Sequence, residues 1–273
     1  MSLGADSASL PLRPLGRTGL RVSPLGLGTV AFGRQTDLKY PREIDRPSDA
    51  AVDALLARAR ALGINLLDTA TAYGDSQERL GQRLRKPLGN ATSPAEPWVV
   101  VTKLGERYTP EQGSRFDFSV RALAIDLERS QEALGRQQLD VVLLHSDGRD
   151  ETALMAGQGF AWLKRERDAG RIRAVGASLK SQAGLDAARR AGADVVMMTL
   201  NPQEPALGPA IGEAAGAGIG VLIKKPFSSG RGHLADLAWG VQQPGVDALC
   251  VGTLDPEHLE ANARCVGAAL SPR

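Results

Sequence analysis

Short, almost continuously apolar runs alternate with longer amphipathic stretches along most of the chain. Such runs are typical of parallel strands that helices cover on the outer face. The predicted strands span Pro24–Gly28, Ile64–Thr69, Trp98–Lys103, Leu139–His145, Ala174–Ser178, Val195–Leu200, Gly220–Lys224 and Ala248–Gly252. The predicted helices span Ala50–Leu62, Glu78–Leu84, Val120–Leu134, Phe160–Ala169, Leu185–Ala191, Ala210–Ala217, Leu234–Val241 and Glu257–Leu270. This regular alternation predicts an α/β fold, a (β/α)8 TIM barrel.

Glycines punctuate this alternation. Five of them stand between a predicted helix and the next strand, where a left-handed backbone is needed to end the helix. They are Gly63, Gly135, Gly170, Gly192 and Gly218. Before the first strand, Leu12–Ser23 has a glycine turn between two short alternating runs, which predicts an N-terminal β-hairpin that closes one end of the barrel.

A doubly wound sheet produces the same alternation and is the second interpretation. It would normally carry a glycine-rich turn after its first strand, and Gly26-Leu27-Gly28 matches that pattern weakly. The first strand is followed instead by a long polar connection over residues 29–48. Because long loops in compact domains are often functional, we expect this connection to contribute to a site.

Composition excludes several classes of function. A length of 273 residues fits one barrel domain over residues 10–273, with residues 1–9 as a mobile leader. The net charge of +2 is too small, and its charges too scattered, for a nucleic-acid binder. No apolar stretch suggests a membrane span or a signal peptide, so we expect a cytoplasmic protein. The two cysteines and three histidines show no metal-ligand spacing, and we expect no metal site.

Four residues with complementary chemistry stand at or just beyond three successive strand ends: Asp68, Tyr73, Lys103 and His145. In a barrel of this kind the active site is built at that rim. A tyrosine hydroxyl can give a proton to a carbonyl oxygen during hydride transfer, but its ordinary pKa of about 10 makes it a weak acid. We expect Lys103, paired with Asp68, to lower the pKa of Tyr73, and a neutral His145 to donate a hydrogen bond to the substrate oxygen.

The segment Gly63–Gly81, GINLLDTATAYGDSQERLG, resembles the signature of the aldo-keto reductases, and the resemblance extends through Val101–Lys103, Leu143–His145 and Gly170–Ser178. It covers nearly the whole chain from Leu12 onward. It implies that Tyr73 is the general acid and base, that Lys103 and Asp68 activate it, and that His145 orients the substrate. An NADPH-dependent reductase of small-molecule aldehydes or ketones, acting as a monomer, is the function implied.

By the same resemblance, the cofactor is NADP, with NAD as the alternative, and it lies across the barrel mouth. The residues expected to contact it are Gly28, Thr29, Ser178, Lys224, Gly252, Thr253, His258 and Asn262. Lys224 is expected to meet the pyrophosphate. Gly252 and Thr253 precede a helix N-terminus, which is a natural anion site.

Several positions depart from the family pattern. Leu179 and Met197 stand where an asparagine and a glutamine would hold the nicotinamide carboxamide, and Lys224 replaces a stacking aromatic. Gly252 and His258 replace a lysine and an arginine, which weakens recognition of a 2′-phosphate because neutral histidine lacks the arginine fork.

Two other classes of function remain open. The altered cofactor positions favour a weakly catalytic or non-catalytic cofactor-binding subunit that senses redox state. A metal-dependent barrel hydrolase would need more histidines at strand ends than His145 alone. Phe32, Tyr108, Phe116 and Phe227 fall in predicted loops and are candidates for an apolar substrate pocket.

Overall fold

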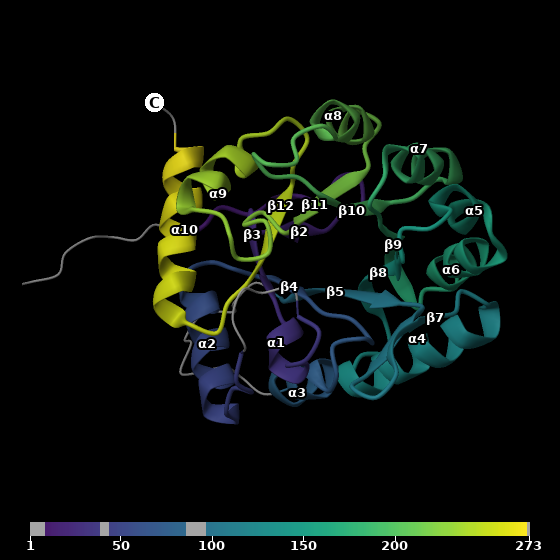
Figure 1. Ribbon diagram of the computed structural model, residues 1–273, viewed down its shortest axis with the longest axis horizontal. Helices are drawn as coiled ribbons and strands as arrows, with labels where there is room; N and C mark the ends of the chain where they lie inside the picture. Colours follow the sequence, from purple (N-terminus) through teal and green to yellow (C-terminus); the bar gives the residue numbers. More distant parts are fainter. Residues whose placement is uncertain (1–8, 39–43, 86–96, 272–273) are drawn as a thin grey trace, which may run out of the picture.

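Eight parallel strands close into a barrel, and helices form a ring around it (Figure 1). The computed structural model describes residues 9–38, 44–85 and 97–271. The barrel strands are β3 (Leu25–Gly28), β4 (Leu66–Asp68), β5 (Val99–Leu104), β8 (Leu139–His145), β9 (Ile172–Ser178), β10 (Val195–Thr199), β11 (Gly220–Lys224) and β12 (Ala248–Gly252). Each strand pairs with the next in chain order, and β12 pairs with β3. The predicted TIM barrel is confirmed, and the doubly wound sheet is excluded.

The helices agree closely with the sequence pattern. They are α1 (Val30–Gly33), α2 (Asp49–Ala61), α3 (Ser76–Leu84), α4 (Val120–Leu134), α5 (Glu151–Ala156), α6 (Gln158–Asp168), α7 (Gln182–Ala191), α8 (Gly208–Gly216), α9 (Leu234–Val241) and α10 (Pro256–Leu270). Serine side chains cap the first turns of α2, α4 and α7, where they accept hydrogen bonds from backbone N–H groups. The five glycines predicted to be left-handed all have φ between +66° and +84°.

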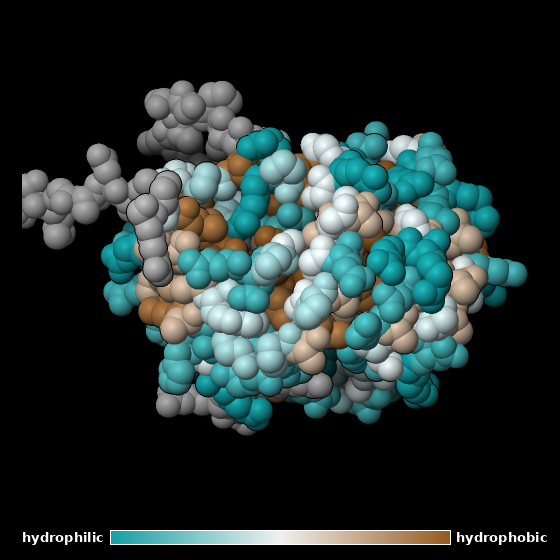
Figure 2. Space-filling view, turned by 90° about the horizontal axis from the view of Figure 1, so that it is seen from above, coloured by the Kyte–Doolittle hydropathy of each residue, from teal (hydrophilic) through white to brown (hydrophobic). Residues whose placement is uncertain are grey.

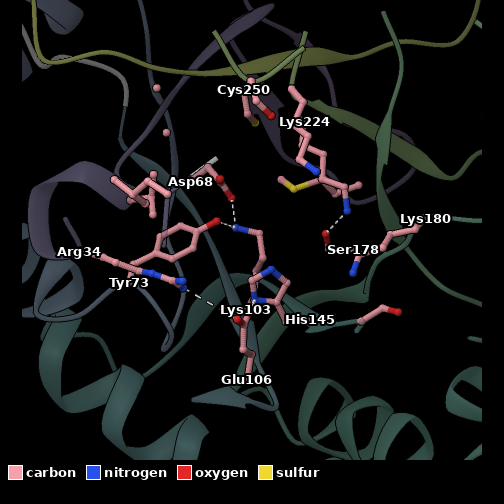
Figure 3. Close-up of a pocket in the computed structure, with 18 of the residues that line it drawn as sticks. Arg34, Asp68, Tyr73, Lys103, Glu106, His145, Ser178, Lys180, Lys224 and Cys250 are labelled. Atoms are coloured by element: carbon pink, nitrogen blue, oxygen red, sulfur yellow. Dashed lines mark hydrogen bonds and ion pairs between the residues drawn. The ribbon is translucent and has the colours of Figure 1, made fainter. Parts of the chain in front are cut away.

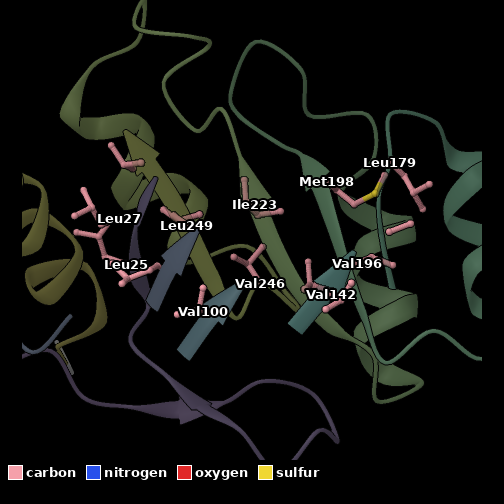
Figure 4. Close-up of a cluster of buried hydrophobic side chains, with 14 of the residues drawn as sticks. Leu25, Leu27, Val100, Val142, Leu179, Val196, Met198, Ile223, Val246 and Leu249 are labelled. Carbon is pink, nitrogen blue, oxygen red and sulfur yellow. The ribbon is translucent and has the colours of Figure 1, made fainter. Parts of the chain in front are cut away.

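Alternate residues of each strand enter two separate hydrophobic layers. Val99 and Val101 of β5 point into the barrel, whereas Val100 between them packs toward the helices. Figure 4 shows the outer layer, with Val100, Val142 and Val196 on the faces of their strands. This period of two places every second strand residue inside, so the residues at the strand ends that face inward meet at the barrel mouth.

The hairpin β1 (Arg13–Pro14) and β2 (Arg21–Val22) closes the amino-terminal end of the barrel, as predicted. Its side chains Leu15, Leu20 and Val22 join the inner layer. Gly16, with φ +48°, lies so close to β11 that a Cβ atom there would be 2.3 Å from the backbone nitrogen of Gly220. The opposite end of the barrel therefore remains as the place for a site.

Four short elements, two helices and two strands, were not predicted. α1 lies inside the supposed polar connection, because Val30, Ala31 and Phe32 form a single apolar turn whose Phe32 is buried. α5 is also too short to show a period. The strands β6 (Glu106–Thr109) and β7 (Gly113–Phe116) pair as an antiparallel hairpin beyond β5, although their sequence is mostly polar.

The surface shown in Figure 2 is largely hydrophilic, with apolar side chains visible in separate patches. Within the described ranges, Leu234 is the one large apolar side chain that is exposed, at 45%. No helix in this part of the chain has both the length and the apolar character needed to cross a membrane. Of the predicted leader over residues 1–9, only Ser9 lies among the described residues.

Candidate active site

A cavity of about 520 Å³ opens at the carboxyl-terminal end of the barrel strands. Parallel pairing brings the ends of sequence-distant strands to one level, for example Asp68 beside Gly28 and His145 beside Ser178. Every barrel strand contributes to the wall. The contributing residues include Gly28, Asp68, Lys103, His145, Ser178, Met197, Lys224 and Gly252. The four predicted catalytic residues are therefore brought together in one cavity (Figure 3).

Lys103 lies at the centre of the polar cluster, with its side chain only 1% exposed. Its Nζ atom donates to Asp68 Oδ1 at 2.5 Å, to the carbonyl oxygen of Thr69 at 3.0 Å and to the hydroxyl of Tyr73 at 3.2 Å. These contacts use all three donors of the ammonium. Because Tyr73 is the acceptor in its contact with Lys103, its own hydroxyl proton is free to point into the cavity.

The loop after β4 places Tyr73 beside Lys103. The backbone N–H of Thr71 donates to the carbonyl of Lys103, and a tight turn follows in which Tyr73 N–H donates to Ala70. Gly74 next adopts a left-handed conformation with φ +59°. The turns in the signature segment Gly63–Gly81 thus place the side chain of Tyr73 beside the strand ends.

Burial dominates the acidity of Tyr73. It raises the pKa of the phenol to about 12, and the nearby Lys103 ammonium lowers it only in part. Lys103 thus acts in the expected direction, but the net pKa of Tyr73 is raised, because the cost of placing a phenolate in a desolvated site exceeds the attraction of a lysine already paired with Asp68. Burial would also lower the pKa of Lys103, but the Asp68 carboxylate raises it, so Lys103 remains charged.

Glu106 is a charged residue of the cavity wall that the sequence reasoning missed. Its Oε2 atom lies 2.7 Å from Nδ1 of His145, at an angle too oblique for an aligned hydrogen bond. Ser114 donates to Oε1 at 2.5 Å, and Arg34 lies 3.9 Å from the same oxygen. Burial would raise the pKa of Glu106, but these three partners lower it to about 2, so the carboxylate stays charged. Its position three residues after Lys103, directly beyond a strand end, was the available signal.

The β6–β7 hairpin and the segment after β3 form one side of the cavity. Arg34 stacks on the ring of Tyr108 at 3.4 Å, and Phe116 and Phe227 belong to the wall. Phe32, in contrast, is fully buried in the core and is not part of the cavity wall. The pocket therefore presents both aromatic and charged side chains to a substrate.

The predicted cofactor residues divide into two groups. Gly28, Ser178, Lys224 and Gly252 line the cavity. Thr29 does not, because its buried hydroxyl donates to the carbonyl oxygen of Asp68 and contacts Ser76 at 2.8 Å. These contacts tie the end of β3 to β4 and α3.

Thr253, His258 and Asn262 lie outside the cavity wall, the first just before α10 and the other two within it. Thr253 accepts a hydrogen bond from the N–H of Asp255, and Asn262 is buried. His258 is exposed, with Nδ1 3.6 Å from the Asp255 carboxylate. Their contact with a cofactor stays a prediction.

Lys224 stands at the cavity wall with its Nζ atom donating to Ser178 Oγ at 2.8 Å. Burial, reinforced by the charges of Lys225, Lys103 and Lys180, lowers its pKa to about 7. Within the described residues, the negative charge that would balance a protonated Lys224 is therefore weak. This is expected for a group that binds an anionic ligand.

Gly28 and Gly252 form a part of the same wall that carries no side chains. The two residues are paired in adjacent strands, and a Cβ atom on Gly28 would come within 3.3 Å of Gly252 N. Together with Ser178 and Lys224, they offer polar donors and a side-chain-free surface to a flat, anionic group. The residues present fit a nicotinamide dinucleotide at this end of the cleft.

Comparisons with known proteins agree with this geometry. The sequence profile of the Aldo/keto reductase family matches residues 24–203. A crystal structure of a Pseudomonas aeruginosa protein assigned as an aldo-keto reductase is 42% identical, covers 95% of both chains and superposes with a TM-score of 0.83.

Two characterised relatives are similar over part of the chain. D-threo-aldose 1-dehydrogenase from a Pseudomonas species is 29% identical over 78% of this chain and 68% of its own length. The NADH-specific methylglyoxal reductase of Escherichia coli strain K12 is 30% identical over 60% of this chain, and the match spans 51% of that enzyme.

Proposed function

The chain belongs to the aldo/keto reductase family, and we propose that it is an NAD(P)H-dependent oxidoreductase of aldehydes or ketones and the corresponding alcohols. The main support for this proposal is the cluster at the cavity wall in which Lys103 contacts both Asp68 and Tyr73. When bound, the reduced nicotinamide supplies the hydride.

Tyr73 is the proposed proton donor in the reducing direction. As negative charge develops on the substrate oxygen, the phenol proton moves to it, and a phenolate is left behind. Lys103 stabilises that phenolate through the existing 3.2 Å contact, and Asp68 holds Lys103 in place. In the oxidising direction the same phenolate takes the proton of an alcohol.

His145 completes the site from the other side of Tyr73. The two rings meet edge to face with centroids 6.2 Å apart, so a substrate oxygen near the phenol also lies near the imidazole. Burial of Lys103 and Asp68 strengthens their interactions, because solvent screens the charges of buried groups less.

For the cofactor, we propose that the cleft accepts both NADPH and NADH. Family membership supports NADPH. NADH use is supported by His258, which is exposed and accompanied by the Asp255 carboxylate that would repel a 2′-phosphate. It is also supported by similarity to an NADH-specific relative. Fluorescence quenching gives both dissociation constants; a Kd for NADPH more than about 100-fold lower than for NADH, a difference of about 2.7 kcal/mol, would contradict dual use.

The substrates of relatives suggest small polar carbonyl compounds, such as aldoses and methylglyoxal. The charged Arg34 and the aromatic Phe116 in the wall suit compounds with both polar and apolar parts. A panel of aldoses, 2-oxoaldehydes and aromatic aldehydes, with loss of NADPH or NADH absorbance as the readout, tests this class.

The decisive variant is Tyr73→Phe, which keeps the ring and removes the proton. We expect a loss of about 10²- to 10⁴-fold in kcat with little change in cofactor affinity. Tyr108→Phe is the matched control, since that hydroxyl is bonded to Thr36 and not to Lys103. Equal rates for wild type and Tyr73→Phe would refute Tyr73 as the acid.

A further inference from the structure

The contact between Glu106 and His145 joins two side chains that are both largely buried. Their side chains are 10% and 18% exposed, and Nδ1 of the imidazole lies 2.7 Å from the carboxylate. Ser114 and Arg34 hold the carboxylate from the other side, at its Oε1 atom. Glu106 is therefore fixed as a charged group against one nitrogen of His145.

A neutral imidazole carries a proton on only one of its two nitrogens, and the other nitrogen has a lone pair. A lone pair on Nδ1 would lie obliquely beside the Glu106 carboxylate, whose oxygen is 2.7 Å from that nitrogen, and would be repelled by its negative charge. A proton on Nδ1 would be attracted, even along an oblique approach. The carboxylate therefore selects the tautomer with the proton on Nδ1.

Several charged groups act on His145. Glu106 on β6 favours its protonated form, whereas Lys103 on β5 and Lys224 on β11 oppose it, and the uncharged Tyr73 ring packs on its edge. Burial is the largest effect, and the net result is a pKa of His145 below its ordinary value. At neutral pH the ring thus carries a single proton.

We infer that Glu106 is a positioning residue that holds this proton on Nδ1 and leaves Nε2 of His145 as a hydrogen-bond acceptor in the cavity. The ring lies between Glu106 and the Tyr73–Lys103 pair, so Nε2 is the nitrogen on the cavity side (Figure 3). This differs from the donor role expected for His145 from the sequence.

The consequence for ligands rests on the proposed function. An alcohol hydroxyl can donate to Nε2 and accept from Tyr73, whereas a carbonyl oxygen can only accept and finds one donor, Tyr73. The neutral site therefore holds the alcohol better than the carbonyl. Protonation of His145 at lower pH supplies a second donor and favours carbonyl binding.

The first test needs no turnover and uses the cofactor-free protein labelled with ¹⁵N-histidine. The chain has three histidines, so the signals of His145 are those missing from His145→Asn. At pH 8 we expect a protonated Nδ1 and an unprotonated Nε2. A wild-type spectrum with the proton on Nε2 overturns the inference, whether or not any variant folds.

Two substitutions of Glu106 separate charge from hydrogen bonding. Glu106→Gln keeps an acceptor but removes the charge, and the pKa of His145 should fall by about one unit or more. Glu106→Met keeps the length and removes the acceptor, and the proton should then appear on Nε2. Glu111→Gln removes one charge at the exposed turn of the same hairpin and is the control. It should change neither the pKa of His145 nor the nitrogen that carries its proton. Unchanged His145 signals in both Glu106 variants overturn the inference.

Kinetics provide the second readout. In Glu106→Met we expect KM for the carbonyl to fall and KM for the alcohol to rise, each roughly three- to tenfold, as for one gained or lost hydrogen bond. Glu106→Asp keeps the carboxylate and should restore the wild-type ratio of KM for the carbonyl to KM for the alcohol. A lower kcat with unchanged KM ratio and unchanged His145 tautomer would mean a merely structural role. A wild-type protein without turnover would refute the proposed function, while the ¹⁵N result would still stand.

Discussion

The buried Lys103–Asp68 pair allows a quantitative prediction for Asp68→Asn, which keeps the shape of the side chain and removes its charge. The two charged atoms are 2.5 Å apart, with side chains 1% and 10% exposed. At an effective dielectric constant of 20, the lost attraction is about 7 kcal/mol, before relaxation of the site. Removing one partner of a buried pair typically costs ~3–5 kcal/mol, and we expect that range here.

The loss should depend on pH in a defined direction. In the wild type, the pKa of Lys103 is raised above its ordinary 10.5 by Asp68, so the pair stabilises the fold fully below about pH 10.5 and loses this effect as pH rises further. In the variant, burial without Asp68 lowers the pKa of Lys103. The difference between the two proteins should therefore be largest at pH 7. It should shrink as pH rises from the lowered pKa of Lys103 in the variant toward about 10.5, and shrink further above about 10.5.

Thermal unfolding followed by circular dichroism at pH 7 and pH 10.5 measures this effect. For a chain of this size, ~3–5 kcal/mol corresponds to a Tm lower by roughly 6–20 °C at pH 7. Asp168→Asn is the matched control, because Asp168 pairs with Arg167 at 3.0 Å but is 68% exposed. That surface pair should contribute less than about 1 kcal/mol. Equal Tm losses for the two variants would refute the reasoning from burial.

Three further variants test other parts of the structure. Lys224→Met should raise Tm at pH 7, because the cost of burying a charge with a folded pKa of about 7 and an ordinary value of 10.5 is present below pH 7 and disappears as pH rises to 10.5. The same variant should weaken NADH binding about tenfold or more by fluorescence titration, as for one charge-assisted hydrogen bond; an unchanged Kd would exclude Lys224 as a cofactor contact. Gly16→Ala should cost several kcal/mol, because its Cβ would be 2.3 Å from Gly220 N, whereas Gly19→Ala, with φ +73° and nothing within 4 Å of the new atom, should cost only the ~1–3 kcal/mol of backbone strain. Similar urea midpoints for the two glycine variants would show that close packing of the hairpin against β11 does not determine the cost of the Gly16 substitution.

Much of the fold could be predicted because it depends on local, repeated signals. Continuous apolar runs mark the barrel strands, and left-handed glycines such as Gly135 and Gly192 mark where helices end. The short α1 and the β6–β7 hairpin escaped because one apolar turn or a polar strand pair gives no period to detect. Their stability comes from contacts with neighbouring elements, as for Glu106 with His145 and Arg34.

The barrel and the set Asp68, Tyr73, Lys103 and His145 could be read from the residues along the chain, since strand ends of a parallel barrel must meet at one rim. The electrostatic state of that set, in contrast, depends on the folded structure. The folded structure shows that burial raises the pKa of Tyr73, that Glu106 contacts His145, and that the hydroxyl of Thr29 donates to the carbonyl oxygen of Asp68 on β4. The physical reason is that pKa values and hydrogen-bond partners depend on desolvation and on every neighbour in space, which the order of residues along the chain does not specify.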